Sequence, residues 1–257
     1  MSGKKKVDLK ITVLEREIKA GKPIYILSIS GGKDSLAMWL AMHEHGVDNM
    51  VPVTFIGGWD WDCAMEEIKR VELITGDRCR KLDSTGYFDN VLSLRGWPSW
   101  HVRWCTGYKR DQIQVFINSI ARAYPEHRVL SAVGIAADEV KRQKKNGVKS
   151  KNIILPLVAL GLKERDCLRV CAQAGVTWGG HYYSHDRMSC WCCPWQKKVD
   201  YRELYFNNRK KWNLMRAMDE TAPEGRKFHW GKNSLEQMEE IFKADKAQGG
   251  RKCLNMT

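Results

Sequence analysis

The sequence predicts an α/β fold, namely a doubly wound, mostly parallel sheet with a helical C-terminal extension. Short apolar runs at 23–30, 51–56 and 129–135 are separated by amphipathic stretches of helical length. Apolar strands that alternate with such helices imply a parallel sheet that is covered on both faces. After Pro194 the chain becomes charged and aromatic, which favours further helices outside the sheet.

The predicted elements follow one another in a regular order. We expect strands over 23–30, 51–56, 79–82 and 129–135, and helices over 34–45, 63–75, 106–123 and 164–174. Asp62 is placed to cap the second helix, and Gly76 to end it. We divide the chain into an N-terminal helix (1–22), an α/β domain (23–196) and a helical extension (197–257), in which Ser234 to Gln237 form a capping box.

Composition and charge limit the functions that the chain can have. No apolar run approaches the roughly 20 residues that span a bilayer, and the basic N-terminus leads into no apolar stretch, so we expect a cytoplasmic protein with no membrane contact. The net charge of +13 favours an anionic partner and permits a nucleic acid. Nine cysteines in a chain without a sign of export favour metal binding or thiol chemistry over disulfides.

The run Ser30-Gly31-Gly32-Lys33-Asp34-Ser35 lies between the first predicted strand and the first predicted helix. Paired glycines allow a sharp turn and a close approach to a ligand. The free N–H groups of the following helix start then point at an anion, and the helix dipole favours its charge. Lys33 adds a cation, the two serines add hydroxyl donors, and Asp34 can cap the helix or help to hold Mg²⁺. The run is no Walker A loop, because Asp34 follows the lysine.

This run resembles the PP-loop of the adenine nucleotide α-hydrolase superfamily. The resemblance implies binding of ATP or an adenylyl nucleotide, with Mg²⁺, at residues 30–35. Members of the superfamily adenylate a substrate and release pyrophosphate, or bind adenylyl sulfates.

The cysteines form a second constellation. Cys190 and Cys193 have the CxxC spacing that lets two thiolates hold one metal ion or cluster from a single turn. Cys105 is the best candidate for a further ligand, and Cys192 is a candidate fourth. The donor set suits a 4Fe-4S cluster, with zinc as the alternative. Cys167 and Cys171 lie four residues apart in an apolar helical stretch, which indicates core packing.

Several blocks resemble the phosphoadenosine phosphosulfate reductase family within this superfamily. They are Gly96 to Ser99 with Arg103 to Thr106 and Lys109, then Gly134 to Glu139 with Arg142, then Leu155 to Leu157 with Lys163 to Asp166, and finally Tyr183 with Arg187 to Pro194. The resemblance covers roughly 23–196. It implies nucleotide binding by Gly134, Asp138 and Arg142, and a catalytic part for Lys109 beside Lys33 and Asp34.

The chain departs from that family in ways that bear on its activity. Gly57-Gly58 stands where the family often has Asp-Thr-Gly, and the usual arginine after Gly134 is missing. Cys253 has the position of the reductases' nucleophilic cysteine but not its neighbours. Cys105 with the CxxC pair looks more like the relatives that move sulfur onto nucleic acids.

Three functions follow as hypotheses. The first is an ATP pyrophosphatase that adenylates a substrate and supports iron–sulfur-dependent sulfur transfer to a nucleic acid, with a separate sulfur donor. The second is a sulfonucleotide reductase that uses Cys253 and a thioredoxin-like protein. The third is a non-catalytic nucleotide-binding subunit of a modification or defence complex, with the basic run 141–151 on a phosphate backbone. Trp97, Trp100 and Trp104 are candidates for stacking on a base, with packing as the alternative.

Overall fold

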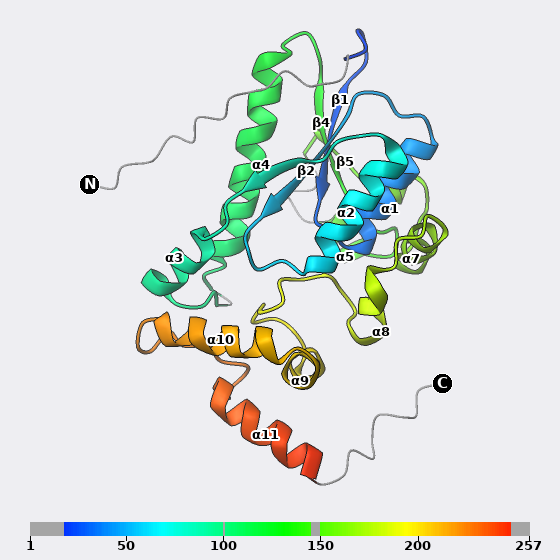
Figure 1. Ribbon diagram of the computed structural model, residues 1–257. Helices are drawn as coiled ribbons and strands as arrows, with labels where there is room; N and C mark the ends of the chain where they lie inside the picture. Colours follow the sequence, from blue (N-terminus) through cyan, green and yellow to red (C-terminus); the bar gives the residue numbers. More distant parts are fainter. Residues whose placement is uncertain (1–17, 100, 145–149, 248–257) are drawn as a thin grey trace, which may run out of the picture.

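The computed structural model describes residues 18–99, 101–144 and 150–247 (Figure 1). Its centre is a five-stranded parallel sheet with the strand order β3-β2-β1-β4-β5. The strands are β1 (Ile24–Ile29), β2 (Met50–Ile56), β3 (Arg80–Asp83), β4 (Val129–Val133) and β5 (Ile153–Ile154). The fold class predicted from the sequence is therefore confirmed.

Helices connect the strands and continue past the sheet. They are α1 (Lys33–Glu44), α2 (Asp62–Thr75), α3 (Tyr87–Arg95), α4 (Trp104–Ala123), α5 (Val140–Gln143), α6 (Pro156–Ala159), α7 (Glu164–Gln173), the short 3₁₀ helix η2 (Trp178–Gly180), α8 (His181–Ser184), α9 (Lys198–Asn207), α10 (Arg209–Thr221) and α11 (Leu235–Ala247). Within the described ranges, no helix is both long enough and apolar enough to cross a membrane.

Side chains of β1 alternate between two apolar cores, as a strand with both faces buried requires. Leu27 and Ile29 pack into the core beneath α1, α2 and α7. Ile24 and Ile26 face the opposite way, into a core closed by Phe116 of α4. Figure 1 shows α4 on one side of the sheet and α1, α2 and α7 on the other.

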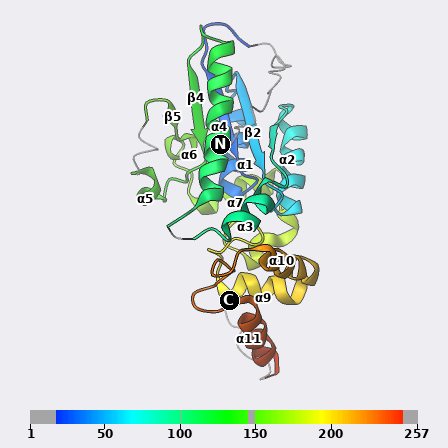
Figure 2. The ribbon, with the colours of Figure 1, turned by 90° about the vertical axis from the view of Figure 1, so that its left-hand side faces the viewer.

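The C-terminal helices α9, α10 and α11 lie beyond the carboxyl ends of the strands, which gives the molecule an elongated shape (Figures 1 and 2). They share an aromatic core with the sheet domain, in which Phe88 and Trp97 pack with residues of the extension such as Trp212 and Phe228. Asp219 of α10 accepts hydrogen bonds from the Trp97 indole (2.7 Å) and from the Phe228 N–H (2.6 Å). The extension is thus packed onto the sheet domain through a common core.

The structure alters some local expectations. Of the helix expected over 1–22, only 18–22 lie among the described residues, and none of these five residues is helical. Asp62 is the first residue of α2 and not its cap, because Trp61 occupies that position without a side-chain cap. The capping box before α11 is confirmed, since Ser234 and Gln237 exchange hydrogen bonds between side chain and backbone N–H.

Candidate nucleotide site and cysteine cluster

The loop 30–32 opens at the point where the strand order reverses. The chain runs from β1 outward to β2 and β3, and then returns to place β4 on the other side of β1. Ligands of open parallel sheets bind at this position, outside the carboxyl ends of the strands. Segment 30–35 after β1 and segment 134–139 after β4 therefore lie side by side.

Close packing on both sides fixes the Gly-Gly turn. Gly31 has a φ of +74°, and a Cβ there would lie 2.9 Å from the Ala64 Cβ of α2. The Trp178 indole N–H donates to the Gly31 carbonyl at 2.7 Å. Ser35 Oγ accepts from the Ser30 N–H at 3.1 Å. Only glycine satisfies the backbone angle and the space at position 31.

Tyr182 of α8 covers the start of α1. Its hydroxyl oxygen accepts a hydrogen bond from the Lys33 N–H at 2.9 Å, and a Cβ on Gly32 would lie 3.3 Å from that oxygen. The Lys33 N–H is one of the groups that a helix start offers to an anion. In this conformation the Tyr182 hydroxyl occupies that donor.

The Lys33 ammonium is held by carboxylates. It lies 3.0 Å from Glu164 and 3.4 Å from Asp34, with its side chain 8% exposed. Burial lowers the pKa of Lys33, but the charges of Asp34 and Glu164 outweigh it, so the pKa lies above its ordinary value. Burial raises the pKa of Asp34, which Lys33 only partly offsets. The Oδ1 of Asp34 is buried and has no hydrogen-bond partner among the described residues. A carboxylate oxygen in this state can coordinate Mg²⁺.

The residues expected to bind nucleotide after β4 have structural partners here. A Cβ on Gly134 would lie 2.8 Å from the Asp34 carbonyl oxygen, so this glycine lets β4 approach the first turn of α1. Asp138 accepts from the Glu164 N–H at 3.1 Å, at the start of α7. Arg142 donates to both carboxylate oxygens of Glu139 at 2.8 Å. Gly134 shapes the loop, Asp138 bonds to the start of α7, and Arg142 pairs with Glu139 within its own segment.

The second constellation lies between α4 and the segment before α9. Lys109 is 3.6 Å from the Cys190 sulfur and 3.5 Å from Asp60. The Cys193 N–H donates to the Cys190 carbonyl at 3.1 Å, and Cys193 and Cys105 both raise the pKa of Cys190, so the three sequence-predicted thiols lie in one region. Burial raises the pKa of Cys190 to about 12, against the opposing charge of Lys109. The same contacts keep Lys109 charged, because Cys190 and Asp60 raise its pKa more than burial lowers it.

The thiols suit a thiophilic metal centre by type but not by their present spacing. Cys105, Cys190 and Cys193 are free and partly exposed. In the part of the chain that the structure describes, no three His, Cys, Asp or Glu side chains lie close enough together to hold a metal ion. Cys192 is fully buried in the aromatic core, next to Cys190 and Cys193, so its place as a fourth ligand stays a prediction.

The remaining cysteines and the tryptophans mostly pack, as the alternative interpretation expected. Cys167 and Cys171 are fully buried between α1 and α7. Trp97 is buried in the shared core, and the Trp104 indole donates to the Gly96 carbonyl at 3.2 Å. Trp100, Cys253 and the central residues 145–149 of the basic run 141–151 lie outside the described residues.

Sequence reasoning missed the segment that lies over the nucleotide loop. The block comparison singled out Tyr183, but its side chain is 97% exposed and Tyr182 makes the contact. Buried Glu67 of α2 holds this segment, since one of its oxygens accepts from the Thr177 and Trp178 N–H groups at 3.1 and 2.9 Å. The sequence pattern of α2 does not distinguish this buried glutamate from a solvent-facing glutamate of the same helix.

Comparison with known proteins gives limited similarity. No protein-family model matches the chain, and no curated protein matches it. Among solved structures, the chain is similar to the U34-tRNA thiolase NcsA from Methanococcus maripaludis, solved with its 4Fe-4S cluster, with 13% identity, coverage of 86% of this chain and 73% of that chain, and a TM-score of 0.43. It is also similar to NMN synthetase from Francisella tularensis, with 13% identity, coverage of 92% and 90%, and a TM-score of 0.44. Neither similarity is high enough to identify the function of this chain.

Proposed function

We propose that this protein is a PP-loop enzyme that transfers AMP from ATP to a substrate oxygen, releases pyrophosphate, and supports sulfur transfer at its cysteine cluster, with a nucleic acid as the substrate. The observation that carries the proposal is the Gly-Gly turn at the strand-order reversal, with Lys33 and the N-terminus of α1 behind it. This arrangement provides backbone donors and a cation for phosphate.

The residues of the loop would have different roles in such a transfer. The α1 N-terminus and the hydroxyls of Ser30 and Ser35 bind and orient the phosphates, and Lys33 exchanges its carboxylate partners for them. The orphan oxygen of Asp34 would hold Mg²⁺. A substrate oxygen attacks the α-phosphorus, the bond to the bridging oxygen breaks, and pyrophosphate leaves. Such a reaction depends chiefly on positioning and charge neutralisation.

Cys105, Cys190 and Cys193 would hold the metal group, after a local adjustment that closes their spacing. A cluster held by these thiolates would supply iron that can bind sulfide from a separate sulfur donor, and that sulfide would displace AMP from the adenylated acceptor. Lys109 and Asp60 hold the Cys190 side of this region in place. The two constellations lie at the same edge of the sheet, so an activated group and a sulfur carrier can meet there.

The test is pyrophosphate release from ATP and Mg²⁺, with single-stranded RNA or DNA added as the acceptor. Lys33→Met should lower the rate by at least about 100-fold, because it removes a preorganised cation from the phosphates. Lys69→Met on α2 removes an exposed lysine and serves as the control. Unchanged release in Lys33→Met, or none from wild type with any acceptor, would refute adenylation by this loop.

The metal group has its own test. Anaerobic purification should yield a protein with a broad absorption band near ~400 nm, iron and sulfide. Cys190→Ala should lose all three, and Cys79→Ala, at a buried cysteine beside β3, should keep them. A colourless protein with one tightly bound zinc would instead show that the cysteines form a structural zinc site.

A further inference from the structure

We propose that a basic groove on both sides of Trp195 binds a single-stranded segment of nucleic acid. The inference rests on the proposed function, because it locates the acceptor of that reaction. We call this feature the Trp195 groove. It joins two pockets of about 590 and 790 Å³ that share Pro194, Trp195 and Gly231.

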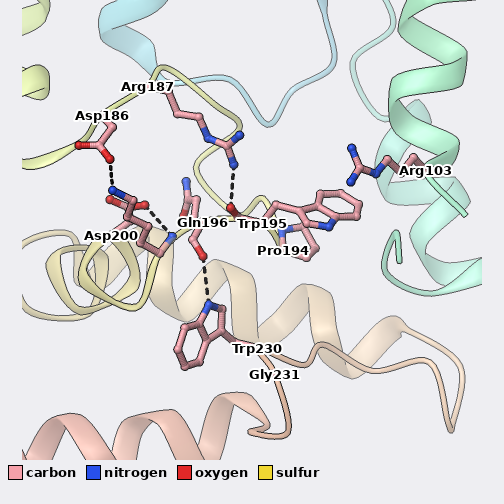
Figure 3. A pocket seen from close by; sticks show the side chains of 10 residues that line it. Arg103, Asp186, Arg187, Pro194, Trp195, Gln196, Asp200, Trp230 and Gly231 are labelled. Carbon is pink, nitrogen blue, oxygen red and sulfur yellow. Dashed lines mark hydrogen bonds and ion pairs between the residues drawn. The ribbon is translucent and has the colours of Figure 1, made fainter. Parts of the chain in front are cut away.

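The walls of the groove come from distant parts of the sequence. Arg103 precedes α4, Arg187 and Gln196 lie on the segment that carries the CxxC pair, and Trp230 lies between α10 and α11 (Figure 3). The Trp230 indole donates to the Gln196 carbonyl at 3.0 Å, which ties the extension to that segment. The extension therefore forms one wall of a groove that the sheet domain alone would leave open.

The charge of the groove suits a polyanion. Its cationic lining residues are Arg95, Arg103, Arg187, Lys197, Arg226 and Lys227. The acidic lining residues Asp186 and Asp200 already bond to Lys197, through its side chain and its N–H respectively. Arg95 and Arg226 are exposed in the second pocket and form no salt bridge within the described residues, so their guanidinium groups can bind phosphates.

The groove also contains aromatic side chains, which a site for phosphate alone would not need. The Arg103 guanidinium lies 4.6 Å from the centroid of the Trp195 ring, and Arg187 donates to the Trp195 carbonyl at 2.7 Å. Both Trp195 and Trp230 remain partly exposed in the pocket. Rigid, partly exposed rings beside cations are platforms for unpaired bases, whereas a duplex hides its bases from them. This combination favours a single strand over a duplex or an acidic peptide.

The position of the groove connects it with the chemistry. Pro194, which lines both pockets, follows Cys193 directly, and Arg103 is two residues from Cys105. A strand bound across Trp195 would therefore pass beside the thiols that are proposed to support sulfur transfer.

The test is fluorescence anisotropy of a labelled 12-nucleotide single strand with the full-length protein, at several salt concentrations. Arg95→Ala combined with Arg226→Ala should raise Kd at least about tenfold. The slope of log Kd against log salt concentration should fall by the equivalent of about two phosphate contacts. Both residues are exposed, so folding should persist. The matched control is Lys243→Ala combined with Lys246→Ala, which removes the same charge from another pocket, beside Tyr205 and Phe206, and should change Kd less than about twofold.

Equal effects of the two double variants would overturn the proposal, because binding would then follow net charge alone. Equal binding of the matching duplex, or displacement by polyglutamate as effective as by unlabelled strand, would also overturn it. The outcome is separable from the proposed function. If the strand binds in the groove but no pyrophosphate is released, this inference is supported and the proposed enzyme activity is refuted. If pyrophosphate is released and the groove variants do not change binding of the acceptor, the enzyme activity is supported and this inference is refuted.

Discussion

Removing the Tyr182 hydroxyl should strengthen the binding of ATP or pyrophosphate. In the structure this hydroxyl accepts the Lys33 N–H at 2.9 Å, so a phosphate must displace it before it can use that donor. Tyr182→Phe keeps the ring, which packs edge-on against Trp178 with centroids 4.8 Å apart. A neutral hydrogen bond contributes about 0.5–1.5 kcal/mol net, so its removal from the competing state should lower Kd by about 2- to 13-fold.

Isothermal titration of the Mg²⁺–ATP complex or of pyrophosphate measures this change. The neighbouring Tyr183→Phe is the matched control, because its side chain is 97% exposed and should leave Kd unchanged. Weaker binding in Tyr182→Phe would refute the reasoning. It would mean that the hydroxyl turns toward the bound phosphate and donates to it, and does not compete with it.

Other perturbations test the packing of the site and of the shared core. Gly134→Ala should weaken nucleotide binding and lower the melting temperature in a thermal scan, because its Cβ would lie 2.8 Å from a carbonyl oxygen of α1, whereas Gly107→Ala, with open space around it, should not. Asp219→Ala strands two buried N–H donors and should cost about 2–6 kcal/mol of unfolding free energy in urea, in one transition for the whole chain, while exposed Glu220→Ala should cost little. Burial and its stacked neighbour His185 lower the pKa of His181 to about 4. The unfolded state therefore binds more protons between about pH 6.5 and 4, stability should fall as pH falls through that window, and His181→Gln should flatten this slope in urea titrations at successive pH values.

The sheet and the nucleotide loop could be predicted from sequence because their signals are local. Strand β1 is a continuous apolar run, and Gly31 has a backbone angle that only glycine adopts readily, so both are visible in a few consecutive residues. Strand β5 has only two residues and gives no such signal. The alternation of buried runs with helices sufficed for the fold class.

The surroundings of the site could not be predicted, because they depend on contacts between distant residues. Tyr182 reaches the loop from 149 residues away, and no pattern distinguishes it from exposed Tyr183. Asp138 fits a nucleotide-binding block as a string, yet its carboxylate accepts the first N–H of α7. Cys192 matched the spacing of a ligand, but the aromatic core of the extension surrounds it. Spacing along the chain predicts which residues are near one another and not which way each faces.

One segment links the nucleotide loop with the cysteines. Between Trp178 and Cys193 it holds the Gly31 carbonyl, covers the Lys33 N–H, and then supplies the thiols beside Lys109. A Cβ on Gly32 would also lie 3.2 Å from the Met188 Cβ, two residues before Cys190. Tyr182, whose hydroxyl a phosphate would displace, therefore lies on the same segment as the CxxC pair. Within the described residues the thiols are too far apart for a metal in this conformation, and a shift of this segment would change their spacing and the cover over the Lys33 N–H together.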